Sequence, residues 1–182
     1  MGFGQKTMLP SVSITPYAQE AMGASIGPLL ATGVDGLGSA VWPGADLALY
    51  WPFSLTSPVA NFWVFFRNGA VAAGNVDARI YDQFGTALTA SIQGAQVGAG
   101  AYQTTAVAVT LGPGTFYFGI VCDNAAATMN RLLFNANEMA AAAGMLQEQL
   151  GAGAAMPNIA TWAHYPLAYC PMSGLSFRPG LL

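Results

Sequence analysis

The sequence predicts an all-β protein, an antiparallel β-sandwich of the jelly-roll kind with extended arms at both ends. Three observations lead to this expectation. Short runs of branched and aromatic residues recur between residues 46 and 134, turn residues separate these runs, and several runs alternate polar and apolar side chains. Short strands at such regular spacing are typical of sandwiches and barrels.

Residues 1–45 are predicted to form an extended apolar N-terminal arm, and residues 46–182 the sandwich domain with a packed C-terminal tail. Gly and Pro recur throughout the arm and exclude a long helix or a central strand. Its apolar side chains, such as Ile14 and Trp42, are unfavourable in water, so the arm is expected to lie on a surface. A short helix is expected within residues 17–31.

The strands of the sandwich are expected at residues 47–53, 59–67, 75–82, 87–92, 102–110, 115–122 and 128–134. The second of these is the most apolar, so it is expected to be central and largely buried. It ends on Asn68-Gly69, the strongest short hairpin signal. In the third, the alternation predicts that Val76, Ala78 and Ile80 face one way.

The remaining segments are less regular. Residues 94–101 are rich in Gly and Ala and predict a loop. Residues 137–150 leave two alternatives open: a helix that follows from their Ala-rich composition, or a strand and loop, because Gly144 interrupts the run. The tail from Met156 places aromatic residues among prolines and is expected to be extended and packed.

Charge is scarce along the whole chain. Only 7% of the 182 residues are charged, against roughly 25% in an average soluble protein. A lone monomer with so few charges would be poorly soluble. Because 54% of the residues are hydrophobic, we expect neighbouring molecules to cover much of the surface.

Composition argues against two classes of partner. The uncharged run at residues 47–66 has the length of a membrane helix, but Pro52 and Pro58 interrupt it, so no membrane partner is expected. Five basic residues are scattered in a chain of net charge −3, so no nucleic-acid partner is expected. No secretory signal is visible at the N-terminus.

The candidates for nucleophilic chemistry are few. His164 is the single histidine and lacks a recognisable nucleophile and orienting acid nearby in the sequence, so it is expected to be a satisfied core or interface residue. Cys122 and Cys170 are expected to be buried thiols in a reducing compartment, with a disulfide as the alternative.

Asp77 and Asp82 form the nearest pair of carboxylates. The structural interpretation is that Asp82 opens a turn and that Asp77 balances Arg79, two residues further on the same face. The alternatives are a calcium site or a glycosidase pair. The glycines at 33, 36 and 38 follow no strand and open no clear helix, which excludes a phosphate-binding loop.

Aromatic residues cluster at positions 50–53 and 62–66. We expect most of them in the core. The alternative is that one or two tryptophans face outward and stack on sugars.

Several motifs resemble a domain of tailed-phage virion proteins, and the resemblance covers roughly residues 45–180. It rests on turns and core strands rather than on a catalytic signature. The motifs are Leu49-Tyr50-Trp51-Pro52-Phe53, Asn68-Gly69-Ala70, Gly74-Asn75-Val76-Asp77, Ile80-Tyr81-Asp82, Gly85-Thr86, Leu111-Gly112-Pro113-Gly114-Thr115-Phe116-Tyr117, Gly144-Met145-Leu146-Gln147-Glu148 and Tyr169-Cys170-Pro171-Met172-Ser173-Gly174-Leu175-Ser176-Phe177-Arg178.

The resemblance implies a non-enzymatic structural protein of a virion that assembles in the cytoplasm of a bacterial host. The expected role is a capsid decoration (cement) protein on the outer surface of the head. Its expected partners are copies of itself, with a trimer as the expected form, and the major capsid protein or other virion proteins. No catalytic, cofactor or metal residues are expected. The alternatives are a tail, neck or fibre component, or a virion module that binds host glycans.

Overall fold

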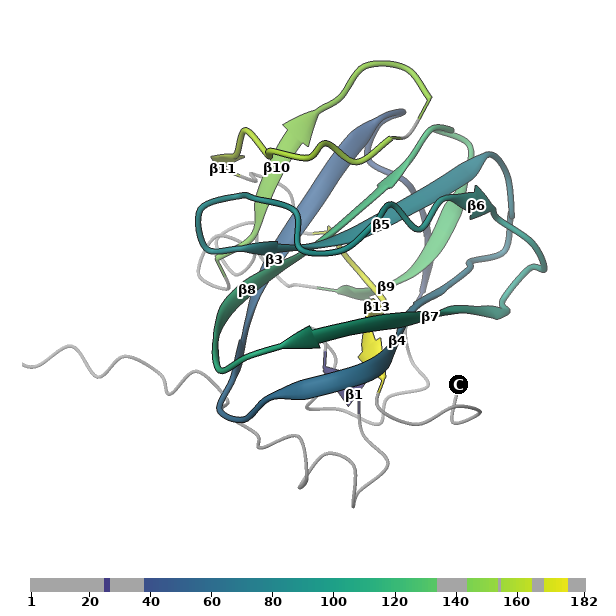
Figure 1. The fold of residues 1–182 in the computed structure, drawn as a ribbon. Coiled ribbons are helices and arrows are strands. Elements are labelled where there is room, and N and C mark those ends of the chain that lie inside the picture. Colours follow the sequence, from purple (N-terminus) through teal and green to yellow (C-terminus); the bar gives the residue numbers. More distant parts are fainter. Residues whose placement is uncertain (1–24, 27–37, 134–143, 154, 165–168, 177–182) are drawn as a thin grey trace, which may run out of the picture.

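A computed structural model gives the fold and describes residues 25–26, 38–133, 144–153, 155–164 and 169–176. These residues form strands and no helix, which confirms an all-β protein (Figure 1). In chain order the strands are β1 (Ser25–Ile26), β2 (Ser39–Val41), β3 (Leu47–Leu55), β4 (Val59–Arg67), β5 (Asn75–Asp82), β6 (Gly94–Ala95), β7 (Tyr102–Leu111), β8 (Gly114–Cys122), β9 (Thr128–Leu133), β10 (Leu146–Gln149), β11 (Ala163–His164), β12 (Tyr169–Pro171) and β13 (Ser173–Ser176).

The strands form antiparallel sheets in two main layers (Figure 1). The large sheet has the order β11-β10-β3-β8-β5-β6, and the small sheet has the order β1-β13-β4-β7. A third sheet, β12-β9-β2, has three strands. The chain passes repeatedly between layers, because β3, β5 and β8 belong to the large sheet whereas β4 and β7 belong to the small one.

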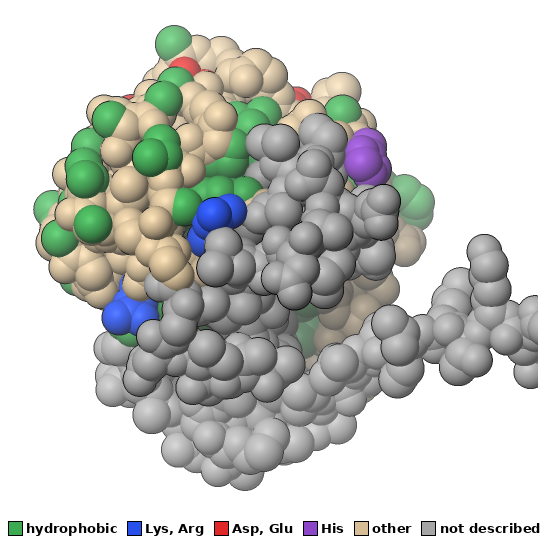
Figure 2. Space-filling view, turned by 180° about the vertical axis from the view of Figure 1, so that it is seen from behind, with side chains coloured by type: hydrophobic (Ala, Val, Ile, Leu, Met, Phe, Trp, Pro, Cys, Tyr) green, Lys and Arg blue, Asp and Glu red, His purple; other side chains and the backbone are tan. Residues whose placement is uncertain are grey.

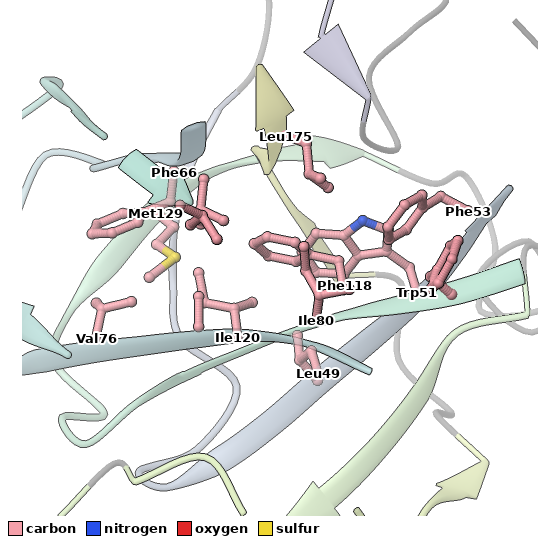
Figure 3. Close-up of a cluster of buried hydrophobic side chains, with 14 of the residues drawn as sticks. Leu49, Trp51, Phe53, Phe66, Val76, Ile80, Phe118, Ile120, Met129 and Leu175 are labelled. Carbon is pink, nitrogen blue, oxygen red and sulfur yellow. The ribbon is translucent and has the colours of Figure 1, made fainter. Parts of the chain in front are cut away.

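The core lies between the layers. Figure 3 shows Leu49, Trp51 and Phe118 of the large sheet pointing toward Phe66 and Leu175 of the small sheet. The rings of Trp51 and Phe118 lie with their centroids 4.7 Å apart. Aromatic side chains bury a large apolar area each, so this layer of rings supplies much of the hydrophobic stabilisation.

Six predicted strands are confirmed with small shifts of their ends, namely β3, β4, β5, β7, β8 and β9. As expected, β4 has a strand on either side, β13 and β7, and most of its side chains are buried. Val76, Ala78 and Ile80 all join the core between the sheets, which confirms the predicted face of β5. Local alternation of side chains was sufficient to predict these strands, because each strand has one face toward the core.

Asn68-Gly69 does not make a hairpin, so that prediction was wrong. The strands on either side of it lie in different sheets, and the dipeptide sits in the passage between them. Asn68 is fully buried, and its side-chain amide donates to Val97 O at 2.7 Å and to Gln103 Oε1 at 2.8 Å. A Cβ at Gly69 would collide with Ser39 Oγ and Thr128 Oγ1, so close packing requires this glycine.

Residues 87–92 do not form the predicted strand. The segment still bonds to β5 through its backbone, from Leu88 N to Ile80 O at 2.8 Å and from Ile92 N to Ala78 O at 3.2 Å. Side chains interrupt this ladder: Thr89 Oγ1 accepts a hydrogen bond from Ile80 N at 3.1 Å, and Asp77 Oδ1 accepts one from Ile92 N at 2.7 Å. The predicted loop at residues 94–101 begins with the two-residue strand β6, which pairs with the start of β5.

The helical alternative for residues 137–150 was wrong where it can be compared. Residues 146–149 are the strand β10, which pairs with residues 47–50 of β3, so a sheet partner overrides helix propensity. Residues 134–143 lie outside the described residues. Of the helix expected within residues 17–31, Ser25–Ile26 is instead the strand β1 and the rest lies outside the described part.

Both segments predicted as arms contribute to the body. In the N-terminal one, β2 pairs with β9 and Trp42 is buried in the core. In the C-terminal one, β13 lies between β1 and β4, and Leu175 is fully buried. Residues 1–24 lie outside the described residues, so the attachment expected of the arm stays a prediction.

Candidate functional site

One edge of the small sheet is formed by β7, which pairs with β4 alone in the described part of the chain. The strand carries no charged residue and no proline over its ten positions, and five of them are exposed: Thr104, Thr105, Ala106, Ala108 and Thr110. Edge strands present a row of unpaired backbone N–H and C=O groups, and proteins usually protect them with charges or proline. This edge is therefore open to another strand.

A groove of about 460 Å3 runs along this edge. One wall is residues 105–109 of β7, and the other is residues 89–93, which follow β5 in the chain. Every lining side chain is uncharged: Thr89, Ala90, Ser91, Ile92, Gln93, Thr105, Ala106, Val107, Ala108 and Val109. The groove suits a neutral, extended partner rather than a charged ligand.

Asp77 holds the second wall in place. Its fully buried carboxylate accepts hydrogen bonds from Ser91 Oγ at 2.6 Å, Ile92 N at 2.7 Å and Met156 N at 2.8 Å. The predicted balance with Arg79 was wrong, because Arg79 instead donates to Asn158 Oδ1 at 2.6 Å. Asp77 thus joins three segments of the chain.

The turn role predicted for Asp82 is confirmed. Its Oδ1 accepts hydrogen bonds from Phe84 N and Thr86 N, both at 2.9 Å. Gly85 in this turn has a φ of +89°, a conformation that favours glycine. Asp77 and Asp82 bind different segments, so the structure does not bring them together as a pair.

The outer face of the large sheet carries an aromatic cluster, which no pattern in the sequence predicted. Tyr50 donates its hydroxyl hydrogen bond to Glu148 Oε2 at 2.8 Å, and its ring lies 5.5 Å from that of Tyr81. Burial raises the pKa of both tyrosines well above the ordinary value of about 10. A side chain at Gly119 would collide with Met156 and Tyr50, so the cluster packs directly on the backbone.

Two tryptophans, Trp162 and Trp63, are partly exposed, and their surroundings differ. Trp162 packs against Tyr117, with ring centroids 4.3 Å apart, and against Tyr50 at 6.0 Å. Trp63, on β4, is half-buried beside buried Phe62 and Phe65. Most aromatic residues predicted for the core are buried there, as expected.

His164 lies exposed on the short strand β11, so it is not a core residue, and the alternative of an interface histidine stays a prediction. Its backbone partner is Leu146 on β10. Cys122 is a free, fully buried thiol, as expected, and burial raises its pKa to about 11. The Cys170 side chain and the glycines at 33 and 36 lie outside what the structure describes.

Two further properties concern the described residues as a whole. Their His, Cys, Asp and Glu side chains nowhere gather in threes at distances that could hold a metal ion. They also contain no helix with the length and hydropathy needed to cross a membrane.

Apolar side chains are exposed at several loops. Phe84 is 79% exposed and Ile159 is 70% exposed, and a bridge between Thr86 and Ile159 brings their segments together. Figure 2 shows hydrophobic side chains spread over the described part of one face, with few charged ones among them. The composition predicted such a surface, but no local pattern identified these residues, because their exposure depends on how the loops pack.

Comparisons of this chain with protein-family models, with curated proteins and with solved structures found no match.

Proposed function

We propose that the protein is a non-enzymatic structural component of a tailed-phage virion. In this role it is a capsid decoration protein on the outer surface of the head, where it binds copies of itself and the major capsid protein. The fold that best fits this role is a jelly-roll-like sandwich with extended arms.

The observation that carries this proposal is the uncharged edge of β7 with its groove. From Gln83 to Cys122 the chain has no charged residue, and this stretch supplies both walls of the groove. An exposed, uncharged edge is a liability in a protein that works alone, because it pairs with other chains. In an assembly the same edge is a binding surface, and this agrees with the resemblance of the central motifs to virion proteins.

The polar groups of the large sheet support a structural role in a second way. Asp77, Asp82 and Arg79 each bind backbone or neutral side-chain groups of the same chain. Such contacts fix loops and segments in place. General acid–base chemistry requires instead a group poised within reach of a substrate proton.

The test is to quantify this chain by mass spectrometry in purified particles of the phage that encodes it, relative to the major capsid protein. Hundreds of copies per particle are expected for a decoration protein. A handful of copies would assign it to the tail, neck or fibre, and its absence from particles would contradict virion membership. Binding of the isolated protein to a glycan array would favour the host-glycan alternative.

A further inference from the structure

The open edge of β7 has a regular stretch that can accept another strand. Residues 102–107 pair in unbroken register with residues 62–67 of β4. Beyond them the register shifts at Asn61, where φ is +54°, and a bulge begins. Bulges disturb strand pairing, so the acceptor stretch ends near Val107. Successive side chains of a strand point to opposite faces, so Thr105 and Val107 share one face and Thr104 and Ala106 share the other. Residues 105–109 line the groove, whereas Thr104 does not.

The sequence contains a segment with the pattern that this edge requires. Residues 11–15 read Ser-Val-Ser-Ile-Thr, between Pro10 and Pro16. Polar and apolar side chains alternate, as in a strand with one buried face, and the prolines limit the strand to these five residues. The segment is uncharged, like the groove, and lies in residues 1–24, outside the described part.

We infer that residues 11–15 of one copy add a strand to the β7 edge of a neighbouring copy. Val12 and Ile14 then fill the groove over Val107, and Ser13 faces outward beside Ala106. Backbone hydrogen bonds along the edge provide affinity, and the two apolar side chains provide specificity, as in other cases of strand addition. This inference rests on the proposed function, because it names the contact through which copies associate.

The strand order lets a neighbouring copy receive the segment without the chain crossing its own small sheet. The chain leaves residues 1–24 at β1, which forms the opposite edge of the small sheet from β7. Within one copy, three strand spacings, about 14 Å, separate β1 from β7. When the small sheets of two copies lie edge to edge, β1 of one copy faces β7 of the next. The ten residues that connect the donor segment to β1, residues 16–25, span up to about 33 Å, which is enough to place residues 11–15 on that edge.

The contact is heterologous, since the donor and the acceptor are different surfaces. Contacts of this kind repeat around a ring when the rotation closes, and a closed ring of three gives the trimer expected from the sequence. A two-fold dimer would instead require the same surface on both partners.

The first experiment measures the assembly of the full chain in solution by sedimentation equilibrium. Val12→Asp and Ile14→Asp are each expected to raise the dissociation constant about 30-fold, which corresponds to the lost burial of one branched side chain. Ser13→Asp is the matched control and is expected to leave it nearly unchanged, because residue 13 faces outward. Equal effects at all three positions, or none, would overturn the inference.

The acceptor edge has its own matched pair. Thr105→Lys places a charge in the groove and is expected to abolish association, whereas Thr104→Lys, on the opposite face, is expected to weaken it much less. Both threonines are exposed, so the thermal unfolding temperature checks that each variant is folded. Association that survives Thr105→Lys would show that another surface joins the copies.

Disulfide cross-linking identifies the donor. A mixture of full-length Ser13→Cys and Ala106→Cys is expected to give a covalent pair that contains one of each, in excess of either self-linked pair. The double variant Ser13→Cys/Ala106→Cys tests the opposite case, in which the segment binds the edge of its own chain. If this variant links mainly within one chain, the inference is wrong. The copy number in particles is independent of these results, so the proposed function can hold even if this contact fails.

Discussion

The polar side chains of β5 and β7 differ in whether they have hydrogen-bond partners within the chain. On β5, Asp77 and Arg79 bind groups of the same chain and tie residues 91–92 and 156–158 to the large sheet. On β7, the hydroxyls of Thr104, Thr105 and Thr110 have no hydrogen-bond partner within the described residues. Within the described residues, the polar side chains of β5 therefore serve the body of the protein, whereas the threonine hydroxyls of β7 do not.

The largest effect is expected from the core that both sheets share. Phe118→Ala removes a fully buried ring that packs against Trp51, so it should lower the free energy of unfolding by about 3–5 kcal/mol. Urea unfolding followed by tryptophan fluorescence measures this loss. A loss below about 1 kcal/mol would place the ring outside the packed core.

The next effect tests the internal bonds of the large sheet. Asp77→Ala leaves three donors without their acceptor, at Ser91, Ile92 and Met156, and should cost about 2–4 kcal/mol. Asp77→Asn keeps the shape and one acceptor oxygen, so its cost should be smaller. Equal stability of all three proteins would show that the carboxylate does not hold these segments.

Alkaline pH should lower the free energy of unfolding more modestly, through two tyrosines and one thiol that are buried. Burial raises the pKa of Tyr50, Tyr81 and Cys122, so the unfolded chain releases these protons at a lower pH than the folded chain does. Their contribution to stability is complete below pH 8 and declines as pH rises, for Cys122 up to its folded pKa of about 11 and for the tyrosines to still higher pH. Between pH 8 and pH 10.5 we expect a loss of about 1–3 kcal/mol, read from urea unfolding. Cys122→Ala should reduce the loss, and an unchanged pH profile would contradict burial of the thiol.

The smallest effect on stability is expected at the open edge. Thr104→Lys alters an exposed side chain of β7 and should change the free energy of unfolding by no more than about 0.5 kcal/mol. Thermal unfolding checks this value. A large loss would show that the outer face of β7 is packed against the body and is not a free surface.

Local patterns in the sequence were sufficient to predict much of the fold. The strands from β3 to β5 and from β7 to β9 could be predicted because alternation and aromatic content mark a strand with one buried face. Asn68-Gly69 could not be interpreted from the sequence, since its role depends on contacts with Ser39 and Thr128. The strand β10 depends in the same way on its distant partner β3.

The candidate site was the least predictable part. Scarcity of charge predicted a covered surface but not its position. The openness of β7 follows from the order of strands in the small sheet, and no residue of β7 encodes that order by itself. The bonds of Asp77 were missed because Met156 lies 79 positions away in the chain.

Hydrogen–deuterium exchange at the backbone amides of β7 tests the central claim most directly. The full-length protein is compared at a concentration where it is monomeric and at one where it is assembled. Amides of residues 104–107 that point away from β4 should become protected on assembly, whereas amides of β5 should exchange equally in both states. Protection confined to the aromatic face around Trp162, or to the loops at Phe84 and Ile159, with β7 unchanged, would contradict the account.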